Sequence, residues 1–118
     1  MSKSVLIVDP SAENREVLRT VLARRGLTIF EADAAERGAE LARAHHPDVI
    51  VLDLEAEAAD PAAICEQLGA GSPDHPPEVI VLGKLRRGPQ FAGGHVIRKP
   101  YHFAPLVDTI QQLAAKAA

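Results

Sequence analysis

The stretch PDVIVLD, residues 47–53, places an uninterrupted run of branched apolar side chains directly before a carboxylate. A run without alternating polar residues predicts a strand that is buried on both faces, as in a parallel sheet covered by helices. Two similar runs occur elsewhere in the chain, VLIV before Asp9 and HVIR before Lys99. The ligand site of a parallel sheet lies beyond the carboxyl ends of its strands, so Asp9, Asp53 and Lys99 are predicted to meet there.

Length and composition bound the class of protein. The 118 residues indicate one domain with a single core. The chain has three Phe, one Tyr and no Trp, which argues against modules that stack nucleic-acid bases and against flavin sites walled by aromatic rings. Its formal net charge of −3 argues against a protein that coats nucleic acid. We therefore do not expect nucleic acid as a partner. We do not expect a membrane either, because no apolar run is long enough to span a bilayer.

Cysteine use and the N-terminal sequence favour a cytoplasmic protein. Cys65 is the one cysteine of the sequence, which excludes a disulfide framework and a cysteine-based metal cluster. The residues before the first apolar run are too few for a signal peptide. We therefore expect a reducing, cytoplasmic environment, and we expect Cys65 to be a small buried residue on a helix.

Strand and helix patterns alternate along the chain, as in an α/β fold. The expected strands are residues 5–9, 27–31, 49–52, 79–82 and 96–98. The expected helices are one from the Ser11 cap to the Gly26 stop, one at 34–45, one at 62–68 and one at about 104–115. The inward stripe of the first helix is predicted to consist of Val17, Leu18, Val21 and Leu22.

One crossover in this alternation has an unusual composition. Residues 83–94, between the fourth and fifth expected strands, contain Gly83, three further glycines and Pro89. Glycine and proline disfavour a helix, although parallel strands still need a crossover connection. We therefore expect a loop or a single turn where a full helix would otherwise lie.

These motifs, in this order and at nearly the right spacing, resemble the receiver domain of response regulators, the phospho-accepting module of two-component signalling. The resemblance covers nearly the whole chain and predicts a single receiver domain over residues 1–118. It rests on VLIVD at 5–9, PDVIVLD at 47–53, VIVL at 79–82 and KPY at 99–101. It implies a three-layer αβα sandwich around a five-stranded parallel sheet of order 2-1-3-4-5, the flavodoxin-like receiver fold. In this chain we expect the fourth helix of that fold to be shortened or absent.

The resemblance also implies roles for the residues at the strand ends. Asp53 matches the phosphoacceptor, a nucleophilic carboxylate that takes a phosphoryl group and becomes an acyl phosphate. Asp9 matches the first of two acidic residues that bind Mg²⁺, to which Asp53 also contributes. Lys99 matches the lysine that neutralises the transferred phosphoryl group. The plainer alternatives are that Asp53 only caps a strand end and that Lys99 only forms a salt bridge.

The metal site departs from the family pattern. Pro10 stands where the second acidic residue belongs, and it carries neither a ligand atom nor an N–H group. Glu55, two residues after Asp53, is a candidate replacement as a metal ligand. A carboxylate beside the acceptor also repels an incoming phosphoryl group, so we favour a solvated acidic loop at Glu55. We therefore expect Mg²⁺ to be held weakly or not at all.

The residues that normally report phosphorylation are also replaced. Receivers carry Ser or Thr at the end of the fourth strand, where this chain has Gly83. They carry a switching aromatic residue three positions before the lysine, where this chain has Val96. Since a relay of this kind needs a two-state element that the phosphoryl group biases, we expect no Thr/aromatic switch.

From these features we expect an atypical, stand-alone receiver domain that is not an enzyme and that acts by protein–protein contact in a phosphorelay. The expected partners are a sensor histidine kinase or phosphotransfer protein and a downstream protein. One alternative is an adaptor that works without phosphorylation, a pseudo-receiver. Another is an aspartyl-nucleophile phosphatase of the haloacid-dehalogenase type, for which Asp53 and Glu55 supply an acidic pair. That family places its pair on the first strand and needs a longer chain, so we favour the receiver.

Overall fold

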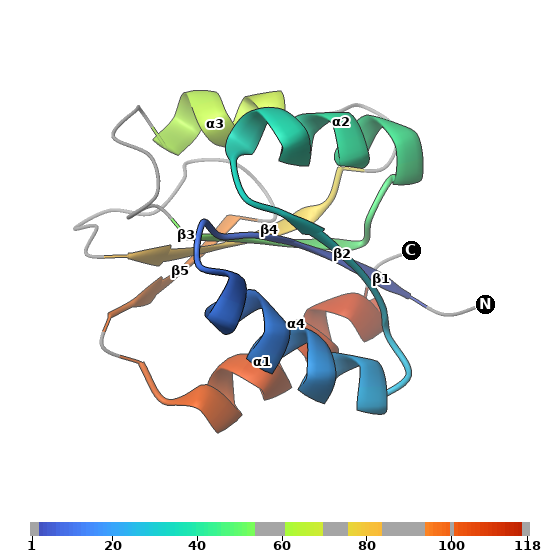
Figure 1. The fold of residues 1–118 in the computed structure, drawn as a ribbon, viewed down its shortest axis with the longest axis vertical. Helices are drawn as coiled ribbons and strands as arrows, with labels where there is room; N and C mark the ends of the chain where they lie inside the picture. The colour runs from blue at the N-terminus through green and yellow to red at the C-terminus, as the bar shows by residue number, and fades with distance from the viewer. Residues whose placement is uncertain (1–2, 54–60, 70–75, 84–93, 100, 117–118) are drawn as a thin grey trace.

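The fold is a central β-sheet with helices on both faces (Figure 1). The computed structural model describes residues 3–53, 61–69, 76–83, 94–99 and 101–116. The strands of the described chain are β1 (Ser4–Val8), β2 (Thr28–Ala32), β3 (Val49–Asp53), β4 (Glu78–Gly83) and β5 (Gly94–Arg98). Its helices are α1 (Ala12–Arg24), α2 (Ala35–His45), α3 (Pro61–Gln67) and α4 (Phe103–Lys116).

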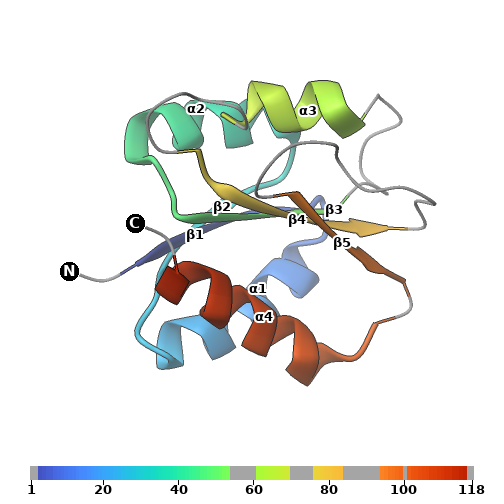
Figure 2. The ribbon, with the colours of Figure 1, turned by 180° about the vertical axis from the view of Figure 1, so that it is seen from behind.

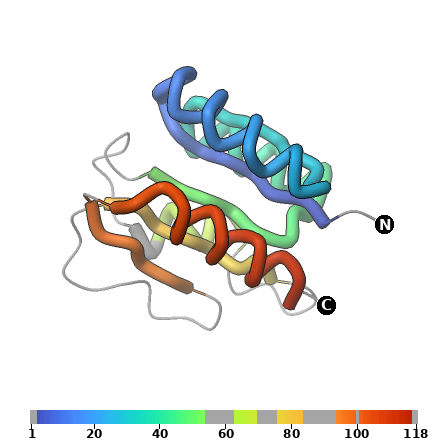
Figure 3. Tube along the Cα trace, turned by 90° about the horizontal axis from the view of Figure 1, so that it is seen from below, coloured from blue at the N-terminus to red at the C-terminus, as the bar shows by residue number. Residues whose placement is uncertain are grey.

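The sheet has five parallel strands in the order β2-β1-β3-β4-β5. Helices α1 and α4 cover one face, and α2 and α3 cover the other, in the views from the front and from behind (Figures 1 and 2). Seen from below, α4 runs over β3 and β4 (Figure 3). This architecture confirms the predicted αβα sandwich and strand order, including the edge position of β2.

The sheet has an apolar core on each side, because the middle residues of its central strands β1, β3 and β4 are all apolar. Side chains of β1 and β3 alternate between the two cores, and their apolar residues are at most 2% exposed. The strand residues facing α1 and α4 are Val5, Ile7, Val49, Val51, Ile80 and Leu82. The strand residues facing α2 and α3 are Leu6, Val8, Ile50, Leu52, Val79 and Val81. Cys65 of α3 is fully buried in the second core, as expected.

Helix α2 lies close to the sheet because its inward face consists of small residues. The buried residues of this helix are Ala35, Gly38, Ala39 and Ala42. A Cβ atom added at Gly38 would lie 2.9 Å from Cγ2 of Val8 and 3.2 Å from Cδ2 of Leu68. Glycine at this position therefore sets how closely the helix approaches the end of β1.

Helix α1 shows how the local sequence sets its two ends. The Ser11 hydroxyl accepts a hydrogen bond from the Asn14 N–H at 3.3 Å, and Gly26 adopts a φ of +85° just beyond the helix. The prediction that Val17 faces inward is wrong: its side chain is 54% exposed, while Leu18 and Leu22 are buried. Val17 lies one residue, about 100° of helical rotation, away from Leu18 and therefore falls on the solvent side of the buried stripe.

The last helix is present as predicted, from Phe103 to Lys116. The crossover expected to lack a full helix falls on residues 84–93, outside the part of the chain that the structure describes. Within the described residues, none of the helices has the length and apolar character needed to cross a bilayer.

Candidate phosphoryl-transfer site

The parallel register brings the carboxyl ends of β1, β3 and β5 to one edge of the sheet. Asp53 is the last residue of β3, and Asp9 and Lys99 directly follow β1 and β5. Lys99 reaches across so that its Nζ lies 2.7 Å from Oδ2 of Asp53. Three residues that are 44 to 90 positions apart therefore form one cluster, because 53 − 9 = 44 and 99 − 9 = 90.

The charged side chains of this cluster are largely buried. Among the described residues, Asp9 and Asp53 are the buried polar or charged ones, at 7% and 4% exposed. The side chain of Lys99 is 17% exposed. A buried charge is costly unless it is paired, and the ion pair of Lys99 with Asp53 offsets that cost for the Asp53 carboxylate.

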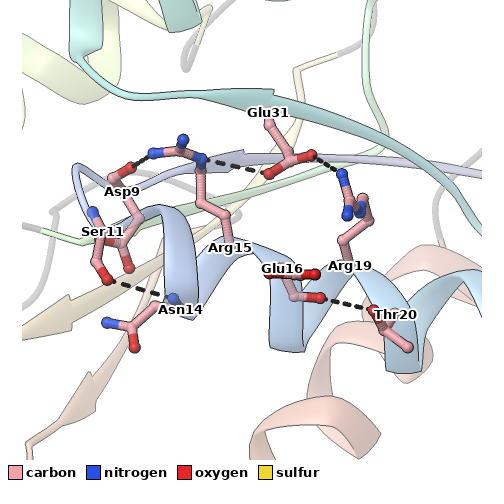
Figure 4. Close-up of polar contacts among 8 residues, drawn as sticks. All are labelled: Asp9, Ser11, Asn14, Arg15, Glu16, Arg19, Thr20 and Glu31. Atoms are coloured by element: carbon pink, nitrogen blue, oxygen red, sulfur yellow. Dashed lines mark hydrogen bonds and ion pairs between the residues drawn. The ribbon is translucent and has the colours of Figure 1, made fainter.

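The turn after β1 holds Asp9 through its side chain and both of its main-chain groups. The Ser11 N–H donates to Oδ1 of Asp9 at 2.8 Å, which closes a turn around Pro10. The N–H of Asp9 donates to the carbonyl of Ala32 at 3.0 Å, and its own carbonyl accepts from the Arg15 guanidinium. Figure 4 shows Asp9 beside Ser11 and Arg15 at the start of α1.

Asp53 and Lys99 lie close enough to Asp9 to affect the ionisation of its carboxyl group. Burial raises the pKa of the Asp9 carboxyl above its ordinary value, the Ser11 hydrogen bond opposes that rise, and the charge of Asp53 adds to it. The charge of Lys99 lowers the same pKa. Two carboxylates and one ammonium leave a surplus of one negative charge, since −2 + 1 = −1 when both carboxylates are ionised.

That surplus, together with hard oxygen donors, fits a divalent cation such as Mg²⁺. Mg²⁺ commonly takes one or two carboxylates and completes its octahedral shell with water and phosphate oxygens. Among the described residues, no group of three or more Asp, Glu, His or Cys side chains is arranged to hold a metal. Asp9 and Asp53 therefore fit the ion as a sparse set of protein ligands. The third proposed ligand, Glu55, lies outside the described residues.

A cavity of about 120 Å³ opens beside the carboxylates, between α1 and the start of α4. Asp9, Asn14, Asp53 and Tyr101 are its polar lining residues, and its other lining is apolar, including Phe103 and Leu106. Burial raises the pKa of the Tyr101 hydroxyl, which therefore remains a neutral hydrogen-bond donor near neutral pH. The sequence places Tyr101 directly after Lys99-Pro100, but nothing in the sequence assigns its hydroxyl to this cavity.

The two positions where the family resemblance predicts switch residues lie on β4 and β5. Gly83 ends β4, is buried and offers only main-chain groups, of which its carbonyl accepts from the Lys99 N–H at 3.2 Å. Val96 sits within β5 and packs partly buried against the core beneath α2 and α3. Neither residue brings a hydroxyl or an aromatic ring to the site.

Comparison with known proteins identifies a family. The model of the response regulator receiver domain matches residues 5–111. The transcriptional regulatory protein KdpE of Escherichia coli K12 is 43% identical over 51 residues, which are 43% of this chain and 23% of KdpE. The polar-differentiation response regulator DivK of Brucella ovis is 33% identical over 55 residues, which are 47% of this chain and 45% of DivK. The matched part of the chain thus spans less than half the length of these relatives.

Solved structures share the fold. The chemotaxis response regulator CheY4 of Vibrio cholerae aligns with a TM-score of 0.79 over 96% of this chain and 99% of that one, at 18% identity. The signal receiver domain of a DNA-binding response regulator from Colwellia psychrerythraea aligns with a TM-score of 0.75 over 97% and 99%, at 25% identity. At such identities the CheY4 alignment supports the fold and not a shared activity.

Proposed function

Because the chain belongs to the response regulator receiver domain family, we propose that it is a receiver whose phosphoacceptor is Asp53. The observation that carries this proposal is the buried Asp53 carboxylate with Lys99 Nζ at 2.7 Å and Asp9 beside it. Receivers take part in two-component signalling, so the proposed donor is a sensor histidine kinase or a phosphotransfer protein. The proposed output is contact with a downstream protein.

The chemistry is a phosphoryl transfer between two side chains. An oxygen of the Asp53 carboxylate attacks the phosphorus of a phosphohistidine, and a new O–P bond forms as the P–N bond breaks. The bond's electron pair leaves with the donor imidazole, and Asp53 becomes an acyl phosphate. Lys99 donates hydrogen bonds to the phosphoryl oxygens and offsets their charge. A bound Mg²⁺ supplies further neutralisation of that charge.

We propose that this transfer is slower than in a receiver with a full acidic pair. Pro10 supplies no ligand atom next to Asp9, so the cation is held by fewer carboxylates. Loss of one preorganised electrostatic contact typically costs about 3 kcal/mol of barrier. Glu55 is the candidate residue for making up part of this deficit: as a metal ligand it predicts weaker Mg²⁺ binding in Glu55→Gln, whereas the solvated acidic loop that we favour predicts no change.

A second candidate is an adaptor that never accepts phosphate. It is favoured by Gly83 and Val96, because a chain without the reporting hydroxyl and aromatic ring has no known route from phosphorylation to a surface change. The receiver is the better proposal because the acceptor, its lysine and one acidic neighbour remain in contact, an arrangement that an adaptor does not need.

The test is phosphorylation of the purified chain by acetyl phosphate in the presence of Mg²⁺, followed by intact mass spectrometry. The receiver predicts the gain of one phosphoryl group that is lost in Asp53→Ala and without Mg²⁺. Asp33→Asn is the matched control, because Asp33 follows β2 at the same edge but is exposed. No gain in the native chain at any acetyl phosphate concentration favours the adaptor.

Two proposals remain, on enzymatic turnover and on cellular location. Receiver domains are signalling modules, and we propose that this chain has no turnover toward an external phosphate ester. Steady hydrolysis of p-nitrophenyl phosphate that requires Asp53 would instead support the phosphatase alternative. A cytoplasmic location is proposed from the single, buried Cys65, which suits a reducing compartment.

A further inference from the structure

We propose that Glu31, on the edge strand β2, is a positioning residue for metal binding at the acceptor site. It orients Arg15, which holds the main-chain carbonyl of Asp9 and so directs the Asp9 carboxylate toward Asp53. The inference rests on the proposed function, because it concerns Mg²⁺ at the same site. Glu31 itself lies on a different element from Asp53, and Arg15 links it to Asp9.

Both main-chain groups of Asp9 are tied to consecutive residues of β2. Its N–H donates directly to the carbonyl of Ala32 at 3.0 Å. Its carbonyl accepts from one terminal nitrogen of Arg15, while Nε of the same guanidinium lies 3.3 Å from Oε1 of Glu31. The planar guanidinium bridges the two acceptors in a fixed geometry, as Figure 4 shows, which a flexible ammonium group does not reproduce.

Glu31 is itself held from its outer side. Its Oε2 accepts from Arg19 at 2.8 Å, so the carboxylate lies between two guanidinium groups of α1 that are one helical turn apart (Figure 4). Side-chain exposure is 46% for Arg19, 26% for Glu31 and 16% for Arg15. Arg15 is therefore the most shielded of the three, and the loss of its anchor leaves a charged group near the site without a fixed orientation.

The sequence around Asp9 explains why its orientation matters in this chain. In the turn, Pro10 provides neither a second acid nor an N–H group, so the Ser11 N–H is the first main-chain donor available to Oδ1 of Asp9. A cation at Asp53 thus depends on the neighbouring Asp9 carboxylate, and Asp9 is held by the two-residue turn, by the Ala32 carbonyl and by Arg15. Groups that orient metal ligands from outside the ligand set commonly control metal affinity.

The test is Mg²⁺ titration of the full chain by isothermal calorimetry, without phosphate or a mimic. Arg15→Ala should weaken Mg²⁺ binding about tenfold, the lower end of the effect of such orienting groups. Glu31→Ala should weaken it in the same direction and by no more than that. Because Glu31 acts through Arg15, the double variant should bind Mg²⁺ as Arg15→Ala does. Multiplying effects in the double variant would overturn the proposal.

Two further variants separate positioning from a general loss of stability. Glu31→Gln retains an oxygen acceptor for Arg15 and should restore most of the affinity that Glu31→Ala loses. Arg37→Ala breaks the exposed pair of Arg37 with Glu40 and should leave Mg²⁺ binding unchanged. Circular dichroism melting of each variant identifies any that is partly unfolded at the titration temperature.

Amide exchange of Ser11 provides a readout that does not need the metal. Its N–H donates to Asp9 Oδ1, so freeing Asp9 in Arg15→Ala or Glu31→Ala should speed its exchange severalfold. If the native chain binds no Mg²⁺, the metal part of the proposed function fails, while faster exchange still supports positioning of Asp9. The inference would be overturned if the Ser11 amide exchanged at the native rate in both Arg15→Ala and Glu31→Ala. It would also be overturned if the native chain binds Mg²⁺ and both variants bind it with the same affinity.

Discussion

The β1/β3 side and the β4/β5 side of the sheet differ in the side chains that they bring to the candidate site. On the first, Asp9 and Asp53 are buried side by side and Lys99 reaches Asp53 at 2.7 Å. On the second, Gly83 and Val96 stand where a hydroxyl and an aromatic ring are expected. The groups proposed to accept a phosphoryl group are present, and the side chains that the family resemblance expects for reporting it are not found at Gly83 and Val96.

The difference teaches that acceptance and readout depend on different physics. Acceptance needs charges fixed within hydrogen-bonding distance of one another, which strand ends of a rigid sheet supply. Readout needs a two-state element whose equilibrium the phosphoryl group biases. Acceptance can therefore persist after readout is lost. Four substitutions test this comparison between the two sides of the sheet.

The largest effect is expected on the β1/β3 side, from Lys99→Met. Removing the ammonium leaves Asp53 and Asp9 buried without their cation, and breaking a partly buried pair in this way costs about 3 kcal/mol. Urea denaturation at neutral pH measures this loss of unfolding free energy. The double variant Asp53→Asn/Lys99→Met should recover part of it, and equal destabilisation of the single and double variants would contradict the pairing.

The next effect is expected on the β4/β5 side, from Gly83→Ser. A hydroxyl at the end of β4 adds a hydrogen-bond donor to the phosphoryl group, and we expect phosphorylation by acetyl phosphate to quicken about tenfold. Time-resolved intact mass measures the rate. Val96→Tyr, which adds a ring and no donor, should leave that rate unchanged. Faster phosphorylation of Val96→Tyr alone would contradict the claim that acceptance and readout depend on different residues.

Packing beneath the β1/β3 side is tested by Gly38→Ala. The new Cβ meets Val8 Cγ2 at 2.9 Å, and the gain in helix propensity offsets only part of the overpacking, so we expect a net loss of about 1 kcal/mol. The midpoint of urea denaturation reports it. Ala39→Gly on the same helix is a control that loses propensity without a clash. A Gly38→Ala midpoint at or above the native one would contradict the close approach of α2 to β1.

The smallest effect is expected from Asp9→Asn, which should raise the stability of the fold. The pKa of Asp9 is raised in the folded chain, chiefly by burial, so its ionised form lowers stability at every pH above its unfolded pKa. Asn retains the oxygen that accepts from Ser11 and removes the charge. In EDTA at pH 7, Asp9→Asn should melt at a higher temperature than the native chain, a gain of about 1 kcal/mol or less in unfolding free energy. Added Mg²⁺ should reduce this difference in melting temperature. A lower melting temperature in EDTA would contradict the charge surplus.

Much of the fold could be predicted from the sequence because the central strands are continuous apolar runs. The runs before Asp9 and Asp53 predict β1 and β3 to within a residue. The edge strand β2 is offset by one residue, as β1 is, because it was expected at 27–31. The edge strand β5 is less well predicted: it was expected at 96–98 and begins two residues earlier. Gly94 belongs to β5 because it pairs with Val79 of β4, and the apolar pattern of the sequence does not predict that pairing.

The candidate site divides in the same way. Strand ends placed Asp9, Asp53 and Lys99 at one edge, because carboxyl ends of parallel strands converge there. The contacts of Arg15 could not be predicted, because they join the first turns of α1 to a different strand, and sequence spacing contains no record of that contact. The cavity position of Tyr101 likewise arises from how α4 begins beside α1.

The central claim, acceptance without the usual readout, is tested most directly by two-dimensional ¹H–¹⁵N NMR of the chain with Mg²⁺ and beryllofluoride, a phosphoryl mimic. The account predicts shifts at Asp9, Ser11, Asp53 and Lys99, with the amides of Val96 and the rest of β5 little changed. Shifts that spread along β5 and into α4 would contradict the loss of readout, and the absence of any shift would contradict acceptance itself.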